Sequence, residues 1–143
     1  MNYEVEMTIN LDLEKVFELY TTEKHFKKWE LGLNRIESNQ KNIFKEGAHS
    51  VLVFKQNEQE FKMNMKIHKI TAPDLLVVSY EVPGAYNLCK NYFYKENQHT
   101  KWIMNVEFEF DQDVDVPLES FISKTKAGME IFKIYAENNK RKR

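Results

Sequence analysis

Apolar and polar side chains alternate along much of the chain, with the period of two that is typical of strands with one buried face. The alternation is clearest at residues 3–9, 61–68 and 102–110. Together with less regular apolar runs it predicts seven strands, at residues 3–9, 33–39, 48–56, 61–68, 75–82, 86–95 and 102–110. Residues 86–95 are aromatic on both faces, so the pattern leaves their orientation open.

A helical period replaces the alternation in three places. After the first strand, one apolar helical face is formed by Leu13, Val16, Phe17 and Tyr20. Asn10 or Asp12 can cap this helix, and Thr21 or Thr22 can cap a short second helix around Phe26-Lys27-Lys28-Trp29. A helix of about 23 residues is predicted from near Pro117, which suits a first helical turn. Its apolar stripe consists of Leu118, Phe121, Ile122, Met129, Phe132 and Tyr135 or Ala136.

The connections between the strands after residue 33 are short, which makes neighbouring strands antiparallel. Each strand has one apolar face, and the long C-terminal helix is the element able to cover the sheet. The predicted fold is therefore α+β, a curved seven-stranded antiparallel sheet wrapped around that helix, with two short helices after the first strand. We expect one domain over residues 1–143, with 137–143 a frayed basic tail.

Composition narrows the class of protein. The chain has 143 residues, 42% hydrophobic and 30% charged, as in one globular domain. Its net charge of −1 argues against a nucleic-acid-binding domain. Cys89 is the single cysteine, so a disulfide within the chain and a cysteine zinc site are excluded. The four glycines are too scattered for a phosphate-binding loop, and no cofactor is expected. Neither a signal peptide nor a spanning helix is apparent, so we expect a cytoplasmic protein without membrane insertion.

The order of elements resembles the helix-grip fold of the START-like superfamily, which includes birch-pollen allergens, polyketide cyclases and lipid-transfer domains. The resemblance covers nearly the whole chain. The local motifs that carry it are V-F-x-L at Val16–Leu19, F-K-K-W at Phe26–Trp29, E-G at Glu46-Gly47 and T-K-W at Thr100–Trp102. It implies a cavity between the sheet and the long helix that holds an apolar small molecule or lipid. It implies no common set of catalytic residues.

Ten Phe, seven Tyr, two Trp and six Met supply 25 bulky side chains for such an interior. Methionine and aromatic side chains are frequent in apolar binding pockets. The candidate ligand-binding residues are Phe54, Met63, Met65, Tyr80, Trp102, Met104, Phe108, Met129 and Phe132. The same residues could equally fill an ordinary core, and the pattern does not separate the two interpretations.

Few polar groups are available to the pocket, namely Ser50, Ser79, Tyr80 and Tyr92 or Tyr94, depending on register. Arg35 is the one arginine outside the tail, which favours a neutral or weakly polar ligand over a carboxylate or phosphate. Cys89 is expected to be a small buried residue, not a nucleophile, because no partner base is identifiable.

Other potential sites are weak. His25, His49, His68 and His99 lack metal-ligand spacing, although His25 would border the pocket mouth in the resembled fold. Asp111, Asp113 and Asp115 start like a calcium loop, but Val116 and Ile122 stand where Gly and Glu are needed. No metal site is therefore expected.

Three functions remain open. The first is binding of a hydrophobic small molecule or lipid in the sheet–helix cavity. The second is a small cyclase- or hydrolase-like enzyme, which requires a tyrosine or histidine inside the same cavity. The third is a protein-interaction module resembling the activators of a heat-shock chaperone ATPase, with a filled core and a distinctive exposed patch. The ligand, any reaction and the oligomeric state stay open.

Overall fold

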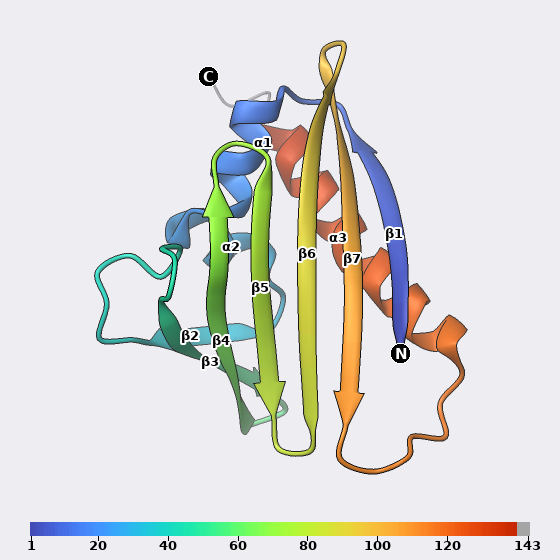
Figure 1. Cartoon of the computed structure of the whole chain (residues 1–143). Coiled ribbons are helices and arrows are strands. Elements are labelled where there is room, and N and C mark those ends of the chain that lie inside the picture. Colours follow the sequence, from blue (N-terminus) through green and yellow to red (C-terminus); the bar gives the residue numbers. More distant parts are fainter. Residues whose placement is uncertain (140–143) are drawn as a thin grey trace.

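Seven antiparallel strands form one curved sheet in the computed structural model, which describes residues 1–139 (Figure 1). The strands are β1 Asn2–Ile9, β2 Leu33–Glu37, β3 His49–Gln56, β4 Gln59–Thr71, β5 Leu75–Val82, β6 Ala85–Glu96 and β7 His99–Phe110. Their order across the sheet is β1-β7-β6-β5-β4-β3-β2, so β1 and β2 form the two edges and the first strand pairs with the last. The predicted antiparallel sheet is confirmed.

Three helices cover one face of this sheet (Figure 1). They are α1 Leu13–Tyr20, α2 Glu23–Trp29 and α3 Leu118–Asn139. The expected two short helices and long terminal helix are therefore confirmed, and the helix-grip fold with them. Residues 137–139 form the end of α3, whereas residues 140–143 of the expected basic tail lie outside the described residues.

Local chemistry explains where these elements begin and turn. Asp12 caps α1, where its Oδ1 accepts a hydrogen bond from the Lys15 backbone N–H at 2.9 Å. Thr22 occupies the N-cap of α2 but makes no side-chain capping bond there. Gly84 has a φ of +88° in the turn between β5 and β6, a conformation that glycine adopts without a steric penalty.

The structure settles the orientation of β6, which the sequence left open. Cys89, Asn91 and Phe93 are buried against the helices, and the alternation turns Tyr92 and Tyr94 to the outer face. Asn91 is completely buried, and both its amide oxygen and its amide nitrogen are hydrogen-bonded. Its Oδ1 accepts from Trp102 Nε1 at 2.9 Å, and its Nδ2 donates to the Leu76 carbonyl at 3.2 Å. A polar residue is tolerated on the inner face because its hydrogen bonds are satisfied.

Hydrogen bonds near both ends of α3 hold it against the rest of the fold. Near its start, the Tyr3 hydroxyl lies 2.7 Å from Thr125 Oγ1. Toward its end, His25 Nδ1 lies 2.6 Å from the Tyr135 hydroxyl, and Glu137 Oε2 accepts from the Asn10 backbone N–H at 2.8 Å. The segment between these contacts spans the interior of the sheet.

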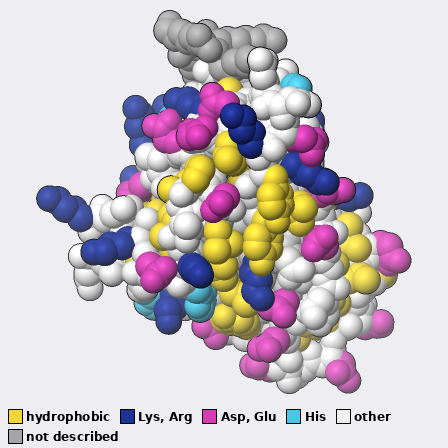
Figure 2. All heavy atoms as spheres, turned by 45° about the horizontal axis from the view of Figure 1, so that its top comes forward, with side chains coloured by type: hydrophobic (Ala, Val, Ile, Leu, Met, Phe, Trp, Pro, Cys, Tyr) yellow, Lys and Arg dark blue, Asp and Glu magenta, His cyan; other side chains and the backbone are white. Residues whose placement is uncertain are grey.

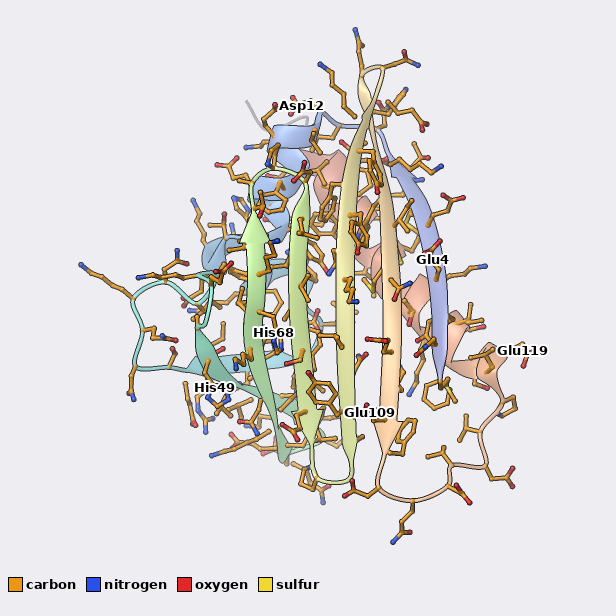
Figure 3. All side chains as sticks on the ribbon, in the orientation of Figure 1. Glu4, Asp12, His49, His68, Glu109 and Glu119 are labelled. Carbon is orange, nitrogen blue, oxygen red and sulfur yellow. The ribbon has the colours of Figure 1, made fainter. Side chains whose placement is uncertain are left out.

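The outer face of the sheet is mixed in character. Figure 2 shows a band of hydrophobic side chains on this side of the molecule, with charged side chains around it. His68 and Glu109 lie on this face (Figure 3), and His68 Nε2 is 2.8 Å from Ser79 Oγ. None of the helices within residues 1–139 combines the length and the hydropathy needed to cross a membrane.

Candidate functional site

A cavity of about 730 Å³ lies between the inner face of the sheet and α3. Its walls come from α1, the end of α2, five strands and the middle of α3. The residues that line it are Tyr20, Trp29, Glu30, Leu31, Phe54, Phe61, Met63, Tyr80, Val82, Ala85, Asn87, Cys89, Trp102, Met104, Val106, Phe108, Lys124, Thr125, Ala127, Gly128, Met129 and Ile131. The lining is largely apolar, and the volume lies within the range of small-molecule sites.

Small side chains on facing walls explain why the interior is hollow here. On β6, the inward residues are Ala85, Asn87 and Cys89, and on α3 they are matched by Thr125 and Gly128. A Cβ placed on Gly128 would meet no heavy atom within 4 Å. Gly128 is also solvent-exposed, so the cavity is open to solvent along this part of α3, and the small side chains of the two walls leave the gap between sheet and helix unfilled.

The mouth of the cavity carries exposed apolar side chains. Leu31 is 66% exposed and Phe61 is 47% exposed. Phe61 stacks on Phe54 with ring centroids 5.0 Å apart, which joins the mouth to the interior. An apolar molecule can therefore reach the cavity over a hydrophobic surface.

Seven of the nine candidate ligand-binding residues come together in the lining, namely Phe54, Met63, Tyr80, Trp102, Met104, Phe108 and Met129. Met65 and Phe132 lie outside the lining and are almost completely buried in the core. Phe132 packs its ring against Tyr20 at 4.9 Å and Trp29 at 5.1 Å. The inward apolar residues thus belong to a cavity at one end and to a filled core at the other.

Glu30 is the ionisable group that the sequence analysis did not identify. It follows Trp29 at the C-cap of α2, and its side chain faces the cavity. Within residues 1–139 its carboxylate has neither an ion pair nor a hydrogen-bond partner. Burial raises its pKa from an ordinary value of 4.5 to about 7. No periodic pattern marks this position, since an acidic residue at the end of a short helix is usually solvated.

Two tyrosine hydroxyls accompany Glu30 in the lining. Burial raises the pKa of Tyr20 well above its ordinary value, and Cys89 and Glu30 raise it further. Burial likewise raises the pKa of Tyr80, with smaller contributions from Tyr20, Cys89 and Glu30. Neither hydroxyl has a hydrogen-bond partner among the described residues. Both stay protonated at neutral pH and are available to a bound molecule.

Of the other candidate polar residues, Ser50, Ser79 and His25 lie outside the cavity lining, whereas Cys89 lies within it. Ser50 is buried, and its Oγ lacks a partner within the described part of the chain. Ser79 is bonded to His68 on the outer face. His25 is absent from the cavity lining and is bonded to Tyr135. Burial raises the pKa of the Cys89 thiol to about 12, which agrees with an unreactive buried cysteine.

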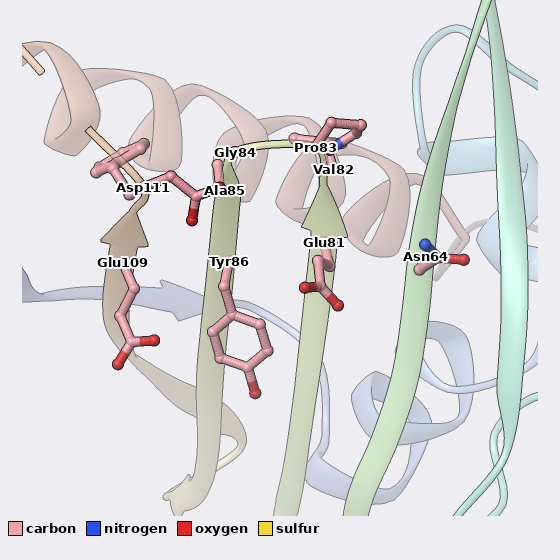
Figure 4. A pocket seen from close by; sticks show the side chains of 10 residues that line it. Asn64, Glu81, Val82, Pro83, Gly84, Ala85, Tyr86, Glu109 and Asp111 are labelled. Atoms are coloured by element: carbon pink, nitrogen blue, oxygen red, sulfur yellow. The ribbon is translucent and has the colours of Figure 1, made fainter. Parts of the chain in front are cut away.

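A second hollow of about 840 Å³ lies at the ends of β5, β6 and β7 (Figure 4). Tyr86 lies between Glu81 and Glu109 of the neighbouring strands, and Asp111 adds a third carboxylate. Most of its lining is solvent-exposed turn and strand end, so ligand binding there would exclude little water. The apolar cavity is therefore the stronger candidate site despite its smaller volume.

The acidic turn of Asp111, Asp113 and Asp115 is exposed. Across residues 1–139, no three His, Cys, Asp or Glu side chains gather closely enough to hold a metal ion.

Comparisons with known proteins place the chain among relatives of this fold. Residues 10–130 match the family model described as "Activator of Hsp90 ATPase homolog 1-like protein". No curated protein is significantly similar to the chain in sequence.

Solved structures share the fold at low sequence identity. Ara h 8.0201 is 15% identical, with a TM-score of 0.79 over 95% of this chain and 97% of that one. The major latex-like protein 151 of Panax ginseng is 9% identical, with a TM-score of 0.73 over 95% and 97% of the two chains. A norcoclaurine synthase of Thalictrum is 13% identical, with a TM-score of 0.73 over 98% and 96%.

Proposed function

The chain belongs to the family of activator of Hsp90 ATPase homolog 1-like proteins, and we propose that it binds a hydrophobic small molecule or a lipid in the cavity between the sheet and α3. The observation that carries this proposal is an apolar cavity of about 730 Å³, which stays unfilled because the facing residues of β6 and α3 are small. The fold commonly binds hydrophobic ligands, which supports it. The cytoplasmic location expected from the sequence stays a prediction.

The hydrophobic effect supplies the affinity. Removing roughly 300 Å² of apolar ligand surface from water contributes about 7 kcal/mol. Association itself costs several kcal/mol, so this contribution alone supports binding only in the millimolar range, and tighter binding requires specific contacts. Polar groups in the lining are therefore expected to decide which apolar molecule is preferred.

Binding can be measured with the native protein, because both of its tryptophans, Trp29 and Trp102, line the cavity. We expect fatty acids or flavonoid-like compounds to change tryptophan fluorescence and to form complexes of one ligand per chain in native mass spectrometry. Gly128→Phe should project a ring into the cavity and weaken binding at least tenfold.

Lys126→Phe is the matched control, since Lys126 is exposed on the same helix and lies outside the lining. It should leave the affinity unchanged. Absence of any complex with the whole panel, or equal binding by Gly128→Phe and wild type, would contradict the proposal.

A second candidate is an acid–base enzyme that uses the same cavity. The observation that favours it is Glu30, whose pKa of about 7 suits proton transfer at neutral pH. The tyrosines required by the sequence hypothesis are present in Tyr20 and Tyr80. Masses of captured ligands, compared before and after incubation with the protein, separate the candidates, because a binder releases its ligand unchanged. The interaction-module hypothesis predicts a filled interior and has less support from this cavity.

A further inference from the structure

Five oxygen-bearing side chains line the cavity. Asn87 and Thr125 are already hydrogen-bonded, and we call the other three the polar corner. They are the carboxylate of Glu30, the hydroxyl of Tyr20 and the hydroxyl of Tyr80. They come from three separate elements, the C-cap of α2, the end of α1 and the middle of β5. None of the three has a hydrogen-bond partner among the described residues. The fold thus places at one cavity three polar groups that are not hydrogen-bonded to any other part of residues 1–139.

The polar corner contains a carboxylate and no cationic side chain. Glu30 supplies the carboxylate, and the lining contains no arginine and no histidine. Lys124 is the one cation among the lining residues, and it is solvent-exposed on α3. A carboxylate removed from water is costly unless a cation or strong hydrogen-bond donors compensate it. Among the described residues, neither a cation nor a hydrogen-bond donor is paired with the Glu30 carboxylate.

Aromatic rings beside Glu30 also favour a cationic ligand. Tyr20 stacks on Trp29 with centroids 4.9 Å apart and meets the edge of Trp102 at 5.1 Å. All three residues line the cavity beside Glu30. Aromatic rings attract cations through their electron-rich faces, and the attraction grows when water is excluded.

We propose that the cavity selects apolar molecules that carry a protonated amine, with the nitrogen paired to Glu30 and hydrogen-bonded to Tyr20 or Tyr80. This inference rests on the proposed binding function and names its ligand class. Carboxylate-bearing ligands are disfavoured, because they would meet Glu30 inside and could pair only with the exposed Lys124, where water screens the interaction.

Three probes with the same apolar body test the inference, namely 4-phenylbutylamine, 4-phenylbutanol and 4-phenylbutyrate. Titration calorimetry at pH 8 keeps the amine protonated, as it does a lysine side chain. We expect the amine to bind the wild-type protein at least tenfold more tightly than the alcohol, and the carboxylate to bind most weakly.

Glu30→Gln should abolish the preference for the amine and leave the affinity for the alcohol within about twofold. Glu109→Gln is the matched control, since it removes an exposed carboxylate on the outer face and should keep the preference. Tyr80→Phe should weaken amine binding by a smaller factor. It provides a second variant with an unchanged ring.

Equal affinities of amine and alcohol for the wild type would overturn the inference, as would an unchanged preference in Glu30→Gln. Both outcomes would leave the proposed function intact, because the alcohol would still bind. If none of the three probes binds, the inference fails. The fatty-acid and flavonoid panel then decides separately whether the proposed function fails with it.

Discussion

The interior of this protein has two ends that are built from the same alternating pattern and packed in opposite ways. The filled end is the aromatic cluster around Phe93 and Phe132, which pack against Tyr20, Trp29 and Trp102 where these three rings border the cavity. The hollow end is the cavity region formed by Asn87, Cys89, Met104 and Phe108 beneath residues 124–128 of α3. Alternation decides which side chains point inward, and their sizes decide whether they meet. A binding site arises here where two facing walls are both built from small residues.

The largest expected difference between the two ends is the cost of removing an aromatic ring. Phe132 is completely buried and contacts three rings of the filled end, at 4.9, 5.1 and 5.5 Å. Phe132→Ala should lower the free energy of unfolding by about 3–5 kcal/mol in chemical denaturation. Phe108→Ala, at the hollow end, should cost only about 1–2 kcal/mol, because Phe108 is half-buried beside an existing cavity. Equal losses would show that the hollow end is packed as tightly as the filled end.

A carboxylate at the hollow end should make stability depend on pH. The pKa of Glu30 is about 7 in the folded protein, whereas its ordinary value is 4.5. Between these values the unfolded chain is ionised and the folded chain still holds its proton, so stability falls as pH rises. The ligand-free wild type should therefore lose about 2–3 kcal/mol of unfolding free energy between pH 4.5 and pH 8, relative to Glu30→Gln.

The difference between these two proteins removes the contributions of other groups. Burial lowers the pKa of His25 and of His68, so both weaken the folded state in acid in either protein. Tyr20, Tyr80 and Cys89 face Glu30 but have raised pKa values and stay neutral over this range. Parallel pH profiles of wild type and Glu30→Gln would show that Glu30 is solvated.

The smallest expected effect is also the sharpest comparison, because introducing a leucine on α3 should act with opposite sign at the two ends. Ala136 is completely buried at the filled end, and Ala136→Leu should cost about 1–3 kcal/mol through overpacking. Gly128 faces open space, and Gly128→Leu should stabilise the protein by about 0.5–1 kcal/mol through helix propensity. Thermal unfolding of both variants measures the pair. Destabilisation by Gly128→Leu would contradict the free space found around this exposed position.

The fold was predictable because its signals are local and repeated. Alternation predicts the strands, the turn at Pro83-Gly84 separates β5 from β6, and Asn10 or Asp12 is expected to cap α1, where the structure has Asp12. The strand at residues 86–95 could not be oriented, because aromatic residues stand on both of its faces. Its buried positions also include Asn91, a polar residue. That side chain is acceptable inside only through bonds to Trp102 and to Leu76, which are distant in sequence. Such partners are invisible to a pattern based on hydrophobicity.

The candidate site was predictable in part. Inward aromatic and Met residues indicated the right interior, but the pattern did not separate Met65 and Phe132 in the core from the cavity lining. The sequence contains one further indication of the cavity. The apolar stripe predicted for α3 has no member between Ile122 and Met129, and this gap holds Thr125 and Gly128. Glu30 gave no such signal, because its burial depends on how the end of α2 meets the sheet.

The strand order has a consequence for how the chain acquires its structure during synthesis. β1 lies at the sheet edge beside β7, with Asn2 paired to Glu107, so the first strand made must wait for the last. At ordinary translation rates of ~5–20 residues per second, this delay is roughly 5–20 s. During that time the apolar side chains of Tyr3, Val5 and Ile9 are not covered by a neighbouring strand. The surface against which α3 packs is also incomplete. We therefore expect nascent chains to depend on protection from aggregation until β7 has left the ribosome.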